Sequence, residues 1–176
     1  KDGNTQILYE RSGGGYYLGW IKGKWYLTST KPSITTTNKI TLKFPYYYSQ
    51  KNSKWANVKL GKSSKTIGQV GCTTTCIAMK KTQILPSTIA KTTAYYEGKT
   101  ASLKWGAVGY TRLDKKNYSL SNIYTLLKQG KPVIVGATNS KGNEHWVVVT
   151  EYNGKGINDS SNYSIKDPGK STRKTL

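Results

Sequence analysis

The sequence predicts an α+β fold, in which helices from the first part of the main domain pack on an antiparallel sheet formed later in the chain. Two patterns lead to this prediction. Cys72, Cys76 and Met79 have the i, i+4, i+7 spacing of one apolar helix face. Further on, the apolar runs 132–137 and 145–152 are typical of buried strands. The early helix is therefore expected to lie against the late sheet.

The N-terminal part, residues 1–39, is expected to form a β-hairpin segment followed by a Thr-rich linker. Strands are predicted over residues 6–9, 16–21 and 25–28, with a turn at Lys22-Gly23-Lys24. The aromatic hairpin is similar to one unit of the cell-wall-binding repeats. Such units stack on neighbours to bury a face, and only one copy is present. A strand pair that merely flanks the next domain is the alternative.

A second domain is predicted over residues 40–176. Its helices are expected where apolar spacing meets a cap or a breaker: 72–81, 88–96 with Ser87 as cap, and 120–127 with Ser119 or Ser121 as cap. Its main strands are expected at 132–137, 145–152 and 163–169. Residues 99–117 are ambiguous. Their aromatic residues, Trp105 and Tyr110, fit either a loop that walls a substrate cleft or ordinary core packing.

Cys72 is a candidate nucleophile because of its position. Residues 66–71 are expected to form a loop that runs into the helix with Cys72 at the junction, and Gly71 lets the backbone turn sharply there. A thiol at a helix N-terminus lies near unpaired N–H groups and the positive end of the helix dipole, which stabilise a thiolate. Free cysteines more often only pack, and we interpret Cys76 as a core residue of that kind.

Cofactor chemistry is not indicated by the composition. Two cysteines one helical turn apart make poor disulfide geometry. Together with the single histidine of the chain, they also do not predict a structural zinc site. We therefore expect neither a metal nor an organic cofactor.

The single histidine, His145, and the later Asp167 supply the other two candidates. A cysteine followed far downstream by a histidine and then by a carboxylate or amide is the order found in cysteine hydrolases. There the thiolate attacks a carbonyl, the imidazole moves the proton, and the third group orients the imidazole. Taken alone, His145 fits a solvated strand end, and Asp167 before Pro168 fits a turn. Other residues could be the third member: Asn139, Asp159 and Asn162.

Several short motifs together resemble one known family. They are Phe44-Pro45-Tyr46-Tyr47-Tyr48-Ser49-Gln50, Trp55-Ala56, Thr66-Ile67, Gly71-Cys72 with Ala78-Met79, His145 and Asp167-Pro168. This pattern resembles the C39-like branch of the papain-like cysteine peptidases over residues 44 to 176. That branch includes double-glycine leader peptidases and many secreted or phage-encoded relatives. The sequence has no transporter segment, which argues against export-coupled leader cleavage, and the C-terminus follows Asp167 sooner than in many such domains.

The resemblance implies a papain-like fold and a role for four residues. Cys72 would be the nucleophile, His145 the general base and Asp167 the orienting group. Gln50 would donate a side-chain hydrogen bond in the oxyanion hole, beside the backbone N–H of Cys72. By itself, a glutamine in a polar loop is ordinarily a surface residue.

The charge of the chain is its strongest compositional feature. With 28 Lys and Arg against 8 Asp and Glu among 176 residues, the formal net charge is +20. Such a field attracts polyanions, so anionic cell-wall polymers, nucleic acid and anionic membrane surfaces are candidate partners. The basic residues are scattered, so no disordered basic tail is predicted. A lysine-rich surface without a polyanion partner is the alternative. No window approaches the ~20 apolar residues of a membrane span.

Three functional hypotheses follow from these patterns. The first is a cysteine peptidase of peptidoglycan stem peptides or cross-links, a wall-active lysin that is extracellular, wall-bound or virion-associated in a phage. The second is a toxin module on the same scaffold that targets a polyanion such as nucleic acid. The third is an inactive domain used for adhesion or assembly.

Overall fold

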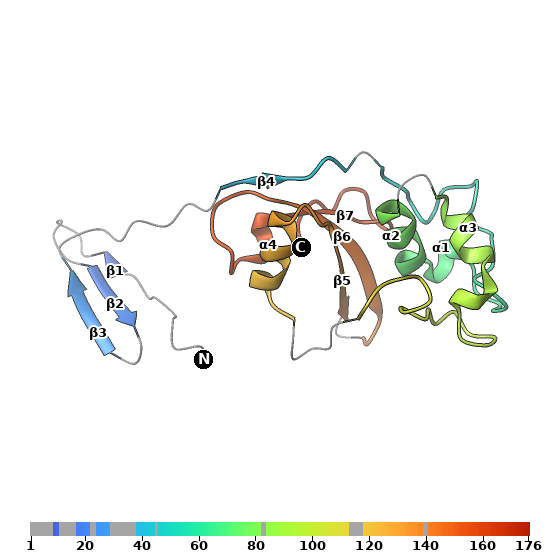
Figure 1. Cartoon of the computed structure of the whole chain (residues 1–176), viewed down its shortest axis with the longest axis horizontal. Helices are drawn as coiled ribbons and strands as arrows, with labels where there is room; N and C mark the ends of the chain where they lie inside the picture. Colours follow the sequence, from blue (N-terminus) through green and yellow to red (C-terminus); the bar gives the residue numbers. More distant parts are fainter. Residues whose placement is uncertain are drawn as a thin grey trace. The chain divides into compact units, whose positions relative to one another are not determined.

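The computed structural model describes residues 9–10, 17–21, 24–28, 38–44, 46–81, 84–112, 118–138 and 141–176. The chain divides into two compact units, Lys1–Thr36 and Thr37–Leu176 (Figure 1). The first unit contains an antiparallel sheet in the order β1-β2-β3, made of β1 (Tyr9–Glu10), β2 (Tyr17–Ile21) and β3 (Lys24–Thr28). The turn predicted at residues 22–23, most of the strand predicted at 6–9 and most of the linker lie outside the described residues.

Most helices of the second unit precede its main strands, as predicted. The helices are α1 (Ile67–Val70), α2 (Cys72–Lys80), α3 (Pro86–Lys91), the 3-10 helices η1 (Thr93–Tyr95) and η2 (Ser160–Asn162), and α4 (Leu120–Lys128). Within the described ranges, no helix combines the length and apolar character that a membrane span requires. Ser119 caps α4 by accepting a hydrogen bond from the Asn122 N–H.

Two helix predictions need correction. Residues 67–70 were expected to be a loop, but they form α1, because Gln69 Oε1 accepts the Thr66 N–H at 3.0 Å and closes the first turn. The helix predicted at 88–96 with a Ser87 cap begins instead at Pro86. Proline suits the first helical position, where its missing N–H would have no partner. That helix ends at Lys91, and the chain continues as the 3-10 turn η1.

The sheet of the second unit is antiparallel and has β6 at its centre. Its strands are β4 (Ile40–Thr41), β5 (Val133–Thr138), β6 (Glu144–Tyr152) and β7 (Tyr163–Lys166). The short strand β4 comes before all the helices of this unit, and the 3-10 helix η2 lies between β6 and β7. β6 pairs with each of the other three strands. Val149 of β6 lies opposite Val133 of β5 and also opposite Ile165 of β7, so these two strands flank β6 on opposite sides. Helices and an antiparallel sheet in one unit make the α+β class.

Both faces of β6 are buried, which explains its continuous run of valines. Val148 packs with Cys76 and Met79 of α2. Val147 and Val149 pack with Ile123 and Leu127 of α4. The same buried cluster also contains Val135, Tyr152, Tyr163 and Ile165. The contact of α2 with β6 puts the start of α2 beside the strand that carries His145. The interpretation of Cys76 as a core residue agrees with its zero exposure.

Gly71 joins α1 to α2 and leaves no room for a side chain. A Cβ atom added there would lie 2.6 Å from both Cα and the carbonyl oxygen of Ile67. Because these are backbone atoms, they cannot turn aside as a side chain would. The glycine therefore sets how closely Cys72 follows α1.

We expect Gly71→Ala to lower the free energy of unfolding by about 1–3 kcal/mol, the usual effect of overpacking. Gly106→Ala is the matched control, since a Cβ atom there meets nothing within 4 Å. Urea denaturation followed by tryptophan fluorescence measures both variants. Equal stability of the two variants would contradict this account of Gly71.

Candidate active site

Cys72 is the first residue of α2 and lies almost entirely within the protein, with 8% of its surface exposed. Burial alone would raise the pKa of the thiol. The hydrogen bond with His145, a backbone hydrogen bond at Trp146 and the charge of His145 outweigh burial and hold the pKa of Cys72 below its ordinary value. The site therefore favours a thiolate.

His145, the second residue of β6, contacts both of the other candidates. Its Nε2 lies 2.7 Å from Oδ1 of Asp167, which leaves Nδ1 as the ring nitrogen for the thiol. The hydrogen bond with Cys72 raises the pKa of the imidazole. Burial opposes this effect, and the hydrogen bond and charge of Asp167 reinforce it, so that the pKa of His145 lies above its ordinary value. Opposite shifts of the two pKa values favour a thiolate–imidazolium pair.

Asp167 directly follows β7, and its carboxylate is completely buried. Oδ1 accepts hydrogen bonds from the backbone N–H groups of Gly169 at 2.8 Å and Lys170 at 3.0 Å, in addition to the His145 contact. Oδ2 forms an ion pair with Nη1 of Arg173 at 3.2 Å, although without hydrogen-bond alignment. Together these contacts fix the orientation of the buried carboxylate.

Gln50 is 7% exposed and lies between the two parts of the site rather than on the surface. Its Nε2 donates to the Gly68 carbonyl at 3.3 Å, and its backbone N–H donates to the Pro168 carbonyl at 2.9 Å. In a continuous helix the Gly68 carbonyl would accept the N–H of Cys72, four residues later. Here it accepts the Gln50 side chain, and the helix is broken at Gly71.

Two of the other candidates for the third group, Asn162 and Asp159, have hydrogen-bond partners away from His145. Asn162 bonds Gly156 and Asn153 within its own turn, each at 2.9 Å. Asp159 accepts from Ser161 at the start of η2. Asn139 lies outside the described residues. Among the described residues, no group of three or more His, Cys, Asp or Glu side chains is arranged to hold a metal ion.

Cys72 lines a cleft of about 790 Å³. Its walls come from residues 63–65, from the end of α1 and the start of α2, from the segment 97–105, from Arg112 and from the start of β6. Trp105 is one of these wall residues, so the loop that was ambiguous in sequence borders the cleft. A peptide chain of several residues fits a cleft of this volume.

Several residues around the site could not be predicted from the sequence. Arg173 supports Asp167 from the C-terminal segment, and Trp146 contributes its backbone to the Cys72 environment. Gly169 is also constrained, since a Cβ atom there would lie 2.9 Å from Cε1 of His145. Of these residues, Gly169 is the one with a local sequence signal, because it follows Asp167-Pro168 in a predicted turn.

Comparison with known proteins gives one match. The model of the Peptidase_C39 like family matches residues 36–176, most of the chain. Searches of curated proteins and of solved structures found no significant match. The chain therefore belongs to the C39-like peptidase family, and the resemblance read from its sequence motifs is confirmed. Membership indicates a cysteine peptidase, a hydrolase that acts on peptide substrates.

Alkylation by iodoacetamide should reveal the lowered pKa of Cys72. We expect the labelling rate to rise at a pH below the ordinary thiol range, and to rise again where His145 loses its proton at a pH above the ordinary imidazole range. His145→Ala should slow labelling near neutral pH by roughly ten-fold or more. The site of labelling is read by peptide mass spectrometry.

Cys76→Ala is the matched control for this measurement. Burial raises the pKa of the Cys76 thiol well above its ordinary value, so this residue should not label. The Cys76→Ala protein should therefore retain the wild-type profile. A single labelling step at an ordinary thiol pH would contradict the thiolate–imidazolium pair.

Arg173 should affect the pH at which His145 loses its proton, because it forms an ion pair with Asp167. Its side chain is half exposed, so Arg173→Gln is expected to leave the protein folded. Without the cation, the carboxylate presents more negative charge to His145, and the second labelling step should move to higher pH. Arg173→Lys should restore the wild-type position. A slower rate with no movement of that step would indicate a purely structural role for Arg173.

Proposed function

We propose that the protein is a papain-like cysteine peptidase in which Cys72, His145 and Asp167 form a catalytic triad. The N-terminal strands would be a hairpin segment that precedes the peptidase domain. The observation that supports the triad is the chain of contacts from the thiol to His145 and from its Nε2 to the buried carboxylate at 2.7 Å. His145, the single histidine of the sequence, therefore contacts both Cys72 and Asp167.

Acylation begins with attack of the Cys72 thiolate on the carbonyl carbon of the substrate amide. The C–S bond forms while the carbonyl π electrons move to oxygen, giving a tetrahedral oxyanion. Its collapse breaks the C–N bond, and the imidazolium of His145 gives its proton to the leaving amine. Asp167 holds the imidazole orientation through Nε2 and supports its positive charge.

The oxyanion would be stabilised by the backbone N–H of Cys72 and by the side-chain amide of Gln50. A first-turn N–H has no intrahelical acceptor, so the Cys72 N–H is available for a substrate oxygen. One Nε2 hydrogen of Gln50 bonds the Gly68 carbonyl, and the second remains for the substrate. A donor of this kind contributes about 3–4 kcal/mol to the transition state in acyl transfer.

Deacylation completes the cycle. Neutral His145 takes a proton from water, whose oxygen attacks the thioester carbonyl of the acyl-enzyme. The C–S bond then breaks, the product leaves as a carboxylic acid, and Cys72 returns as the thiolate beside an imidazolium.

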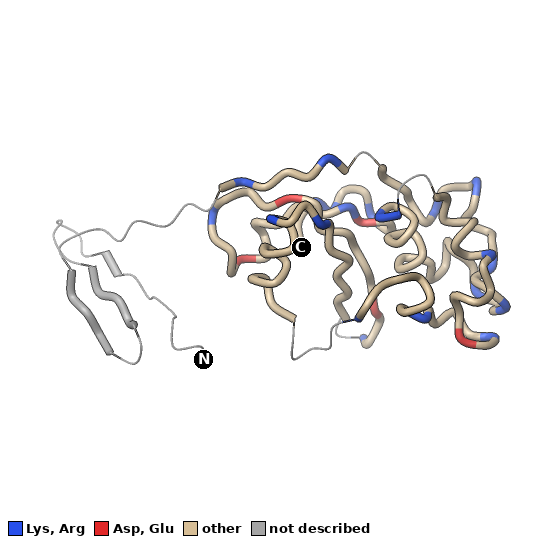
Figure 2. Tube along the Cα trace, viewed as in Figure 1, with Lys and Arg blue, Asp and Glu red and all other residues tan. Residues whose placement is uncertain are grey.

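The proposed substrate is the peptide part of peptidoglycan, so the protein would act as an extracellular wall lysin or as a phage tail-associated one. The net charge of +20 supports this proposal, since anionic wall polymers would attract the enzyme. Figure 2 shows Lys and Arg spread along most of the second unit with few acidic positions among them. Attraction of this kind concentrates the enzyme on its substrate without specifying the bond.

We expect the wild-type protein to release new peptide ends from purified Gram-positive walls. Cys72→Ala should lower this release by roughly four orders of magnitude or more, the scale seen when a covalent nucleophile is removed. Mass spectrometry of the soluble fragments identifies the bond. Cys76→Ala, which removes the same atom one helical turn away, should retain most activity.

The charge also supports a second candidate, a module that targets nucleic acid. Binding to RNA or DNA would then weaken steeply with salt, as phosphate contacts release counterions. Degradation of RNA by the Cys72→Ala protein would favour this candidate over the peptidase. Absence of nucleic-acid degradation, together with wall cleavage that depends on Cys72, would favour the peptidase.

A further inference from the structure

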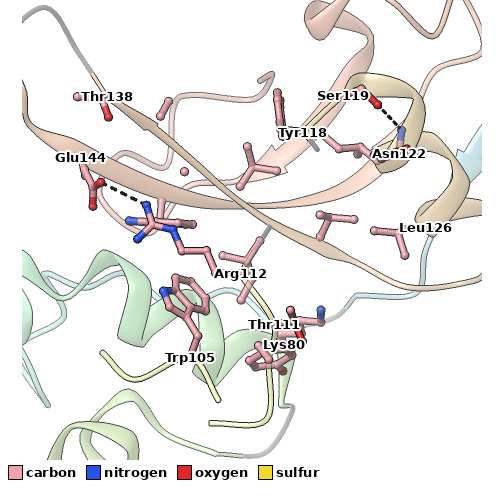
Figure 3. A pocket seen from close by; sticks show the side chains of 18 residues that line it. Lys80, Trp105, Thr111, Arg112, Tyr118, Ser119, Asn122, Leu126, Thr138 and Glu144 are labelled. Carbon is pink, nitrogen blue, oxygen red and sulfur yellow. Dashed lines mark hydrogen bonds and ion pairs between the residues drawn. The ribbon is translucent and has the colours of Figure 1, made fainter. Parts of the chain in front are cut away.

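A second cavity, of about 330 Å³, runs along β5 (Figure 3). All six residues of β5, Val133–Thr138, line it in succession. In Figure 3, Arg112 and Glu144 lie toward one end, with Trp105 beneath them, and Leu126 of α4 lies toward the other. We call this cavity the β5 groove.

The β5 groove adjoins the cleft that contains Cys72. Four residues line both: Trp105, Arg112, Glu144 and Trp146. The indole rings of Trp105 and Trp146 are in contact, with centroids 4.9 Å apart, and Arg112 lies over the Trp146 ring at 5.4 Å. A chain that occupies the cleft can therefore continue past this shared wall into the groove.

The backbone of β5 suits an extended ligand. Among the strands that the structure describes, β5 pairs only with β6, so its other edge has no strand partner, and all six of its residues line the groove. An unpaired strand edge offers alternating N–H and C=O groups to an added strand. Gly136 makes room for the Trp146 indole, since a Cβ atom there would lie 2.8 Å from the ring.

The groove walls favour apolar side chains. More than half of the lining residues are apolar or aromatic, and the large ones include Trp105, Tyr110, Ile123, Leu126, Val133 and Trp146. The charges of Arg112 and Glu144 offset one another, because the two side chains form an ion pair at 3.6 Å. Lys80 lies over the Tyr110 ring at 4.6 Å rather than projecting into open space. A large apolar side chain is therefore the best complement of this site.

We propose that the β5 groove binds an extended segment of the peptide substrate beside the cleaved bond and selects a large apolar side chain in that segment. This inference rests on the proposed peptidase function and assigns it a specificity site. Leu126 and Tyr118 are the residues that best test it, since both line the groove away from Cys72 and neither is fully buried.

The test uses binding, which does not require catalysis. Immobilised Cys72→Ala protein is incubated with a random library of end-blocked peptides at high salt, which screens the net positive charge. Sequencing of the retained peptides by mass spectrometry should show enrichment of Trp, Phe, Leu or Ile at one position. Methylation of the neighbouring backbone amides should weaken retention, because an added strand binds through its backbone.

Substitutions in the same Cys72→Ala protein test the groove itself. Leu126→Glu should lower retention of these peptides roughly ten-fold or more, because it places a charge on an apolar wall. Tyr118→Ala should also lower it, and it adds no charge at a side chain that is 49% exposed. Leu85→Glu is the matched control, since Leu85 is 47% exposed and does not line the groove. Thermal unfolding checks that each variant is folded.

Equal retention by the Leu126→Glu, Tyr118→Ala and Leu85→Glu proteins would overturn the inference. So would retained peptides without an apolar preference. The wild-type protein is then given the retained peptides, and cleavage at a fixed distance from the apolar residue supports both proposals. Cleavage elsewhere overturns the assignment of the groove but leaves the peptidase. Retention without any cleavage overturns the peptidase, and with it the role of the groove in substrate selection.

Discussion

The contacts of the buried Asp167 carboxylate are the interaction on which the arrangement of the second unit depends. An ionised group without solvent is tolerated only where donors and charges replace water. Here His145, two backbone N–H groups and Arg173 do so. The Tyr47 hydroxyl also donates to the backbone carbonyl of Asp167 at 2.9 Å. Through these contacts, Asp167 connects the central strand β6, the loop that contains Tyr47 and the C-terminal segment.

The position of the thiol depends on packing in the core rather than on a flexible loop. Cys76 and Met79 of α2 pack against Val148 of β6, three residues after His145. Shifting α2 along β6 would move Cys72 relative to the imidazole and would also open this contact. Because close-packed interiors resist such shifts, the distance between the Cys72 thiol and the His145 imidazole is held by the same contacts that stabilise the fold.

Much of the second unit could be predicted from sequence because its signals are local. The apolar spacing after Cys72 gave α2, and the valine run after His145 gave β6. The structure brings Cys72 and His145 into contact, as the order of residue types had suggested. Helix α1 was not predicted, because four residues are too few to show a periodic pattern. Its first turn depends on the hydrogen bond between Thr66 and Gln69.

The parts that could not be predicted depend on contacts between distant segments. Arg173 has nothing in its local sequence to distinguish it from other basic residues of the chain. Its role exists only because the turn after Asp167 brings the guanidinium to Oδ2. The shared wall of Trp105 and Trp146 likewise joins residues from a loop and a strand. A single sequence records such residues as ordinary surface or core positions.

The scattered positive charge and the proposed specificity site, the β5 groove, are different features of this molecule. The basic side chains are distributed, so their attraction for an anionic surface is long-ranged, weakens with salt and does not orient a peptide. The β5 groove has few charges, and two of them, Arg112 and Glu144, offset one another. Its contacts are short-ranged and largely independent of salt. An enzyme built in this way can remain on a charged matrix through one set of residues and choose a bond through another, so a change of ionic strength would alter its residence on the matrix more than its specificity.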